Sequence, residues 1–366
     1  MEQLFFELIQ VSLGTRTCLS HTPRADEWGE LYAMAKKQSL VGVCFAGVQK
    51  LQTQRQEPPE MLYLTWMGMA AKIQQRNEVV NKQCMELQSH LTEEGFRSTI
   101  LKGQGMACLY DDSLKMLRQS GDIDICIDGG KRMVTKVASL YGVKQPKWYF
   151  KDIELPIYAD TQIEAHYIPG IFFNYFVNKK WLKWCRDNND IIYGNCIGYD
   201  HLKITTPTLD FNVVFILVHI YRHVFDSGIG LRQLMDWYFV LKSRNTNNAS
   251  TCPVYANDED ILSLFKSFGM LRFAKGIMWI MQYVFGIERD FLLCAPDEME
   301  GKFLLKEIVK HGNFGNAERN NVNKKLPKLM HFIKKDIALL LHYPLETLSM
   351  PVYFIGYYII SKIKNI

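Results

Sequence analysis

The segment "RQSGDIDICID", residues 118–128, determines how the rest of the chain is interpreted. Its isoleucines alternate with acidic residues, which is the period-two pattern of a β-strand. The three isoleucines would share one face of that strand, and Asp122, Asp124 and Asp128 would share the other. Like charges on one face repel each other, and the repulsion grows as water is removed. Either this face is fully solvated or positive charge lies on it.

A glycine-rich turn precedes this strand. The segment "FRSTILKGQGMACLY", residues 96–110, predicts a short apolar strand, a turn at "KGQG" and then a helix. Glycines let backbone N–H groups approach a phosphate, and a helix N-terminus favours anions. The candidate phosphate-binding residues are Lys102, Gly103 and Gln104 in the turn, with Arg118 and Ser120 just before the acidic strand.

The acidic strand is a candidate metal site. Asp122 and Asp124 would lie on one side of the strand, about 7 Å apart. Carboxylate oxygens are the ligands that Mg²⁺ prefers, and two divalent ions can neutralise the charge that develops in nucleotidyl transfer. Glu164 in "TQIEAHYI", residues 161–168, supplies a third carboxylate on a second predicted strand, with His166 on the same face. A solvated strand face would explain the acidic strand alone, and a purely structural turn would explain "KGQG" alone. The order along the chain of turn, helix, acidic strand and second carboxylate-bearing strand favours a metal site.

Periodicity divides the chain into three parts. Residues 1–90 carry apolar residues at helical spacing, and Gly95 is placed to end the last of these helices. Residues 91–206 contain the predicted strands, including extended or hairpin structure over 187–207. Residues 207–366 are again helical, with two helices joined near Gly228 and Gly230. The sequence therefore predicts an α+β protein with an N-terminal helical segment, a core and a C-terminal helical domain.

Two histidines and a charged pair stand out in the C-terminal part. His219 and His223 are four residues apart and would share one helix face, but the glutamate of an H-E-x-x-H metal site is absent. They would form a metal pair, line the substrate cleft or be buried with satisfied hydrogen bonds. Arg232 and Asp236 share the same spacing, so they would form a helix ion pair, or Arg232 would face the nucleotide.

Composition restricts the classes of partner. The 366 residues carry a net charge of +5, which suits an anionic ligand such as a nucleotide but argues against a long nucleic acid. Nine cysteines without a C-x-x-C pair indicate reduced thiols in a cytoplasmic protein. The N-terminal segment has acidic residues within its apolar stretch, so it predicts an amphipathic helix and not a signal peptide.

No transmembrane segment is expected, because no uncharged apolar run reaches about 18 residues. The nearest approach is "MPVYFIGYYIISKIKNI", residues 350–366, which Pro351 would break and which ends in lysines. It predicts a terminal helix docked on the protein, or peripheral membrane contact through the C-terminus.

A family resemblance joins these features. The segment "LKGQGMACLYDDSLKMLRQSGDIDICI", residues 101–127, resembles the signature of an uncharacterised bacterial nucleotidyltransferase family of the DNA polymerase β-like superfamily. It shares L-K-G, a tyrosine and R-x-x-x-D-I-D with that signature, although Gln104 stands where the superfamily usually has Gly or Ser. The family's acidic-x-His strand is similar to "EAH", residues 164–166. Its later helical region is similar to "LVHIYRHVFDSGIGLRQLMDW", residues 217–237.

The resemblance implies a fold, a site and an activity. The fold would be a minimal nucleotidyltransferase mixed-sheet core, residues 91–206, flanked by helical segments 1–90 and 207–366. Asp122, Asp124 and Glu164 would be catalytic and bind Mg²⁺ or Mn²⁺, and the Gly103 turn would hold a triphosphate. The further cleft residues would be His166, His219, His223 and Arg232.

The implied reaction is metal-dependent transfer of a nucleoside monophosphate from a nucleoside triphosphate to an acceptor, with release of pyrophosphate. Glu164 would assist deprotonation of the acceptor. A small molecule, a sugar, a lipid or a protein would each serve as acceptor, and the sequence does not select among them. The alternative is a nucleotide-binding or regulatory interaction protein that has the same fold and does no chemistry.

Overall fold

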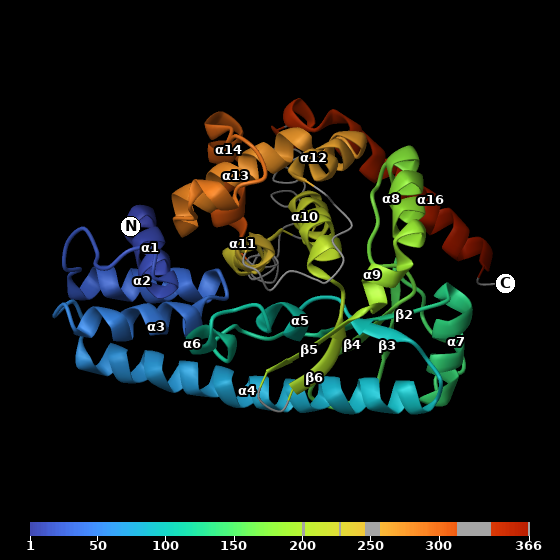
Figure 1. Cartoon of the computed structure of the whole chain (residues 1–366), viewed down its shortest axis with the longest axis horizontal. Helices are drawn as coiled ribbons and strands as arrows, with labels where there is room; N and C mark the ends of the chain where they lie inside the picture. The colour runs from blue at the N-terminus through green and yellow to red at the C-terminus, as the bar shows by residue number, and fades with distance from the viewer. Residues whose placement is uncertain (200–201, 227, 246–256, 313–337, 365–366) are drawn as a thin grey trace.

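The computed structural model describes residues 1–366 apart from 200–201, 227, 246–256, 313–337 and 365–366. Within the described residues, a four-stranded mixed sheet and a two-stranded hairpin are surrounded by helices (Figure 1). The predicted α+β class is confirmed.

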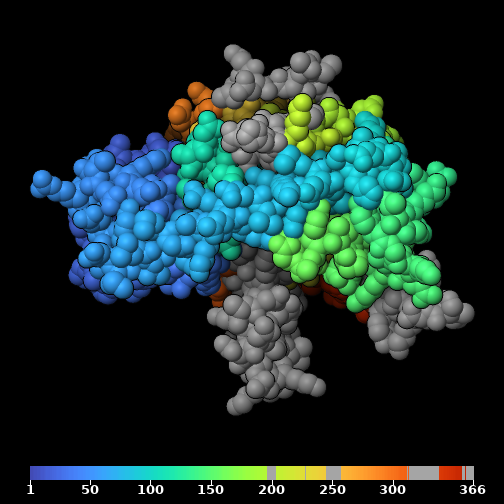
Figure 2. All heavy atoms as spheres, turned by 90° about the horizontal axis from the view of Figure 1, so that it is seen from below, coloured from blue at the N-terminus to red at the C-terminus, as the bar shows by residue number. Residues whose placement is uncertain are grey.

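The N-terminal part is helical, as predicted. It consists of α1 (Glu2–Leu13), α2 (Ala25–Lys37), α3 (Val41–Gln52) and α4 (Glu60–Glu93). Gly95, with a φ of +79°, follows α4 in the left-handed conformation that glycine adopts readily. Helix α4 is 34 residues long and crosses one face of the molecule from the N-terminal helices to the region of α7 (Gly130–Leu140) (Figure 2).

The main sheet has the order β1-β2-β4-β3. Its strands are β1 (Ser98–Ile100), β2 (Ile123–Ile127), β3 (Asp152–Leu155) and β4 (Ile163–His166). The pair β2–β4 is parallel, and β1 and β3 are antiparallel to their neighbours. The acidic strand predicted within residues 118–128 is limited to β2, so Asp122 and Asp128 flank it. Strand β3 was not predicted.

Short elements lie between the first two strands and after the last strand of the main sheet. The helix predicted through residues 106–110 is reduced to the short α5 (Gln104–Ala107), which is followed by α6 (Asp112–Lys115). After β4 come α8 (Tyr175–Asp187) and α9 (Asn189–Tyr193), and then the hairpin of β5 (Asn195–Tyr199) and β6 (Leu202–Thr206). The prediction of extended structure over 187–207 is thus correct for the hairpin and wrong for α9.

The remaining helices make up the C-terminal part of the chain. They are α10 (Leu209–Phe225), α11 (Leu231–Asn245), α12 (Asp258–Ser267), α13 (Leu271–Phe285), η1 (Arg289–Phe291), α14 (Glu298–His311) and α16 (Pro344–Lys364). The two helices predicted around Gly228 and Gly230 are confirmed as α10 and α11. The expected break at Pro351 is wrong, because α16 continues through this proline.

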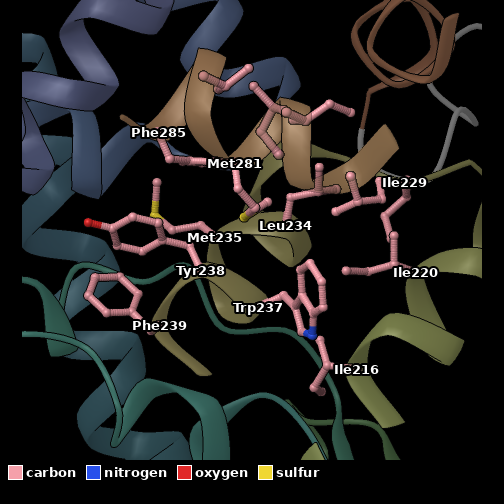
Figure 3. Close-up of a cluster of buried hydrophobic side chains, with 14 of the residues drawn as sticks. Ile216, Ile220, Ile229, Leu234, Met235, Trp237, Tyr238, Phe239, Met281 and Phe285 are labelled. Carbon is pink, nitrogen blue, oxygen red and sulfur yellow. The ribbon is translucent and has the colours of Figure 1, made fainter. Parts of the chain in front are cut away.

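Two hydrophobic cores hold these layers together. The larger core includes side chains of α11 and α13 such as Leu234, Trp237, Met281 and Phe285 (Figure 3), and α1 packs against α13 within it. The smaller core lies between the sheet, α7 and the second half of α4. The N-terminal and C-terminal helices therefore share one core, and the domain boundaries at residues 90 and 206 stay a prediction.

No helix within the described residues is long and apolar enough to cross a membrane. The seven cysteines whose side chains are described are free thiols, and most of them are buried.

Candidate active site

A cavity of about 280 Å³ lies between the main sheet and helices α10 and α11. It brings together most of the residues selected from the sequence, namely Lys102, Gly103, Arg118, Asp122, Asp124, Glu164, His166, His219, His223 and Arg232. Gln104 and Ser120 are not among its lining residues. Segments more than 100 residues apart in the chain thus contribute to one concave site.

The parallel pairing of β2 with β4 positions the acidic groups. The register places Asp124 beside Glu164 and Cys126 beside His166. The His166 Nε2 atom lies 2.9 Å from Asp124 Oδ1 and 3.4 Å from Glu164 Oε2. One ligand atom from each of Asp124, Glu164 and His166 lies within 4.8 Å of the others. Among the described residues, these three side chains form the one group with the spacing of a metal site.

Positive charge does lie on the acidic face of β2. Asp124 is buried, and Lys102 Nζ lies 2.8 Å from its Oδ1 atom. Lys151 Nζ lies 2.7 Å from Asp152 Oδ2 and 3.2 Å from Glu164 Oε2. A buried carboxylate is tolerated only when it is paired and hydrogen-bonded, which these two lysines achieve.

Lys151 and Asp152 are site residues that the sequence analysis missed. Both line the cavity, and the register of β3 on β4 places Asp152 beside His166. The period-two pattern of a β-strand is present in "KDIEL", residues 151–155, where apolar residues alternate with acidic ones. A four-residue strand gives only two alternations, so its pattern is weak.

The charges at the site shift the pKa values of its carboxyl groups in opposite directions. Burial opposes ionisation of Asp124 and Glu164, but the two lysines and His166 outweigh it. They hold the pKa of Asp124 well below its usual range and lower the pKa of Glu164 to about 2. In contrast, the pKa of Asp122 is raised, chiefly by repulsion from Asp124. Further positive charge would therefore be stabilised beside Asp122.

These donors fit a divalent cation. Two carboxylates and one imidazole suit Mn²⁺, and the carboxylates suit Mg²⁺ as well. The structure groups His166 with Asp124 and Glu164, whereas the sequence analysis grouped Asp122 with them. Asp122 lies just before β2 and outside the 4.8 Å group, so its role as a metal ligand stays a prediction.

The turn between β1 and α5 lies at the predicted place, and its phosphate-binding role stays a prediction. Gly103 has a φ of +56°, a conformation that side chains disfavour, and it lines the cavity. The Gln104 side chain is buried and donates hydrogen bonds to Asn77 and Asn81 of α4. Gln104 therefore anchors the turn to α4 with its side chain and does not present that side chain to a phosphate.

The predicted ion pair between Arg232 and Asp236 is replaced by another pair. Arg118 Nε and Nη2 each lie 2.7 Å from an oxygen of Asp236, and Tyr110 also donates to this carboxylate. Arg232 Nη1 donates to the backbone oxygen of Gln119, and its Nε atom is buried without a partner. Burial is the main reason why the pKa of Arg232 falls to about 10. A ligand anion would stabilise the charge of this guanidinium.

The two histidines of α10 line the wall opposite the carboxylates. Their ring centroids are 4.3 Å apart, and neither belongs to the metal-type group. Burial, reinforced by the charge of Lys102, lowers the pKa of both rings, that of His223 to about 3. Both rings are therefore neutral at pH 7. Both side chains line the cavity, and the roles considered for His219 and His223 from the sequence stay predictions.

Residues 24–286 match a family described as "Uncharacterised nucleotidyltransferase", and the chain belongs to this family. The predicted membership of a nucleotidyltransferase family is confirmed, whereas the bacterial distribution and the polymerase β-like superfamily stay predictions. No curated protein is significantly similar to the chain.

One solved structure is similar in part. It is the crystal structure of an antigenic nucleotidyltransferase-like protein from Paracoccidioides brasiliensis, with 11% sequence identity and a TM-score of 0.36. The match covers 56% of this chain and 91% of that chain. A likeness this distant supports no conclusion about the site.

Proposed function

We propose that this protein transfers a nucleoside monophosphate from a nucleoside triphosphate to an acceptor in a reaction that requires Mg²⁺ or Mn²⁺. The observation that supports this most strongly is the group formed by Asp124, Glu164 and His166 on adjacent parallel strands, at a cavity of about 280 Å³. Membership of the nucleotidyltransferase family supports the same activity.

The residues around the cavity suit the separate parts of the substrate. Lys102 and the Gly103 turn would contact the triphosphate, and Arg232 would contribute a buried cation to it. A divalent ion held by Asp124, Glu164 and His166 would neutralise charge on the phosphates.

The reaction forms a bond from the acceptor oxygen to the α-phosphorus and breaks the bond to the bridging oxygen, so that pyrophosphate leaves. Glu164 is the most exposed of the three grouped side chains, with 22% of its side chain accessible. Its pKa of about 2 makes it a weak base, so we assign it the role of holding the ion and not that of receiving the acceptor proton. His219 and His223, as neutral rings on the opposite wall, would contact the acceptor.

The test replaces Asp122 and Asp124 together with asparagine, which keeps side-chain size and removes both charges. Metal-dependent release of pyrophosphate from a nucleoside triphosphate should fall at least about a hundredfold, which corresponds to about 2.7 kcal/mol of lost transition-state stabilisation. The far-ultraviolet circular dichroism spectrum should be unchanged.

Glu154→Gln is the matched control, because Glu154 pairs with Glu164 in the register and is exposed. Its turnover should equal that of the wild type. Unchanged turnover in the double variant would refute the proposed chemistry. Nucleotide binding in calorimetry, without consumption during long incubation, would instead support the non-catalytic binding protein.

A further inference from the structure

An exposed apolar stripe runs along α16. Its side chains recur at alternating intervals of three and four residues, which places them on one helix face. They are Leu345, Leu348, Val352, Ile355 and Ile359, with exposed fractions from 51% for Ile359 to 70% for Val352. Large apolar side chains scattered singly over a surface are ordinary, but a contiguous stripe indicates an interaction site.

Contacts on another side of α16 hold the stripe outward. Tyr353 and Phe354 pack on Phe150, with ring centroids 5.2 and 5.5 Å apart. The buried Glu346 accepts a hydrogen bond from the backbone N–H of Phe173 at 2.6 Å. The stripe is thus fixed by the packing of the helix on the body of the protein.

The apolar surface continues onto the start of α8. A groove of about 740 Å³ lies between the two helices, and Tyr175 and Phe176 line it while being 63% and 72% exposed. The exposed lysines Lys179, Lys180 and Lys183 follow within the next two turns of α8. Exposed aromatic and apolar side chains are thus bordered by basic ones.

Basic residues outnumber acidic ones on this surface, although Lys183 pairs with Asp187. The sequence of α16 contains a single acidic residue, Glu346, which is buried, and it ends in the segment "SKIK", residues 361–364. An apolar helix face with aromatic residues and lysines beside it is the composition of helices that lie in the plane of a membrane interface. A symmetric second copy would instead bring two surfaces with the same excess of basic residues together, which is unfavourable.

We propose that α16 and the start of α8 form a docking surface for a lipid bilayer that contains anionic lipids. The helix lies along the membrane surface, its apolar stripe enters the boundary between headgroups and acyl chains, and the lysines of α8 contact lipid phosphates. This inference goes beyond the proposed function and does not depend on it.

Vesicle sedimentation of the full chain tests this proposal. Vesicles of phosphatidylcholine with phosphatidylglycerol should bind the wild type at least about tenfold more tightly than vesicles of phosphatidylcholine alone, because a lysine near an anionic surface contributes about 1 kcal/mol. The variant with Leu348→Glu, Val352→Glu and Ile355→Glu should remain in the supernatant.

The matched control carries Met61→Glu, Leu64→Glu and Met67→Glu, which alter exposed apolar residues of α4. It should sediment like the wild type, and circular dichroism should show all three proteins folded. Equal sedimentation of the α16 variant and the wild type would overturn the proposal. The proposal would also be overturned if sedimentation equilibrium showed that the wild type dimerises and the α16 variant does not, while vesicles bind neither of these two proteins.

Discussion

At the scale of single residues, the site is a set of buried charges that compensate one another. Asp124 is accommodated because Lys102 and His166 contact the same carboxylate oxygen. The sequence shows the acidic residues of one strand, but the lysine that faces them comes from the turn after β1. A row of carboxylates within one strand therefore indicates a binding site only once the positively charged groups that face it are known.

The histidines of α10 predict a pH dependence of stability. The pKa values of His219 and His223 are lowered by burial, so the unfolded chain binds protons that the folded chain does not, from about pH 6.5 downward. The free energy of unfolding should therefore fall as the pH decreases through 6.5, by up to about 1.4 kcal/mol per pH unit for each ring. Urea denaturation at pH 7.5, 6 and 5 measures this slope.

Replacing both rings with asparagine should flatten the slope. His21→Asn serves as the control, because the side chain of His21 is 55% exposed, and it should retain the slope of the wild type. If the double variant loses as much stability between pH 7.5 and 5 as the wild type does, the histidines are not the cause.

At the scale of elements, α3 approaches the segment before β2 without room for a side chain. A Cβ atom at Gly42 would lie 2.3 Å from the backbone oxygen of Leu117. Gly42→Ala should therefore destabilise the fold by about 1–3 kcal/mol and reduce turnover, because the displaced segment carries Arg118. Thermal unfolding and pyrophosphate release measure the two effects.

Gly68→Ala is the control, since Gly68 lies in α4 with no atom within 4 Å of the added Cβ. It should stabilise the protein by about 0.5–1 kcal/mol, because glycine is unfavourable within a helix. A Gly42→Ala variant as stable as the wild type would show that α3 and the segment before β2 can move apart without loss of free energy of unfolding.

The sequence predicts the long elements well and the short ones poorly. Helices α1 to α4, α10 and α11 carry several turns of apolar periodicity, so the pattern identifies them. Strand β3 and helix α9 have four and five residues, too few for any period to be distinguished. Most candidate residues line one cavity. Lys151 was missed because Glu164, one of its two carboxylate partners, lies on a different strand. A proline within a helix usually ends or kinks it, yet α16 continues through Pro351.

At the scale of the whole molecule, the N-terminal helices and helix α13 of the C-terminal part support each other. Helix α1 packs against α3 and α13, and Ile9 is fully buried. Ile9→Ala should therefore lower the global free energy of unfolding by about 2–5 kcal/mol. Tryptophan fluorescence and far-ultraviolet circular dichroism should report this shift at the same urea concentration.

Leu64→Ala removes a comparable side chain that is 45% exposed, and it should change stability by less than about 1 kcal/mol. If Ile9→Ala shifted one probe and left the other in place, the N-terminal helices would unfold separately from the rest.

Helix α4 belongs to both cores, and this restricts which changes of chain length the protein tolerates. Trp66 and Ala70 of its first half are buried in the larger core, and Val80 and Leu87 of its second half in the smaller one. One residue inserted between these halves would rotate them by about 100° relative to each other. The amide side chain of Asn77, which binds the backbone oxygens of Met116 and Arg118, would then point elsewhere. Insertions and deletions among relatives should consequently spare α4 and accumulate in the connecting loops.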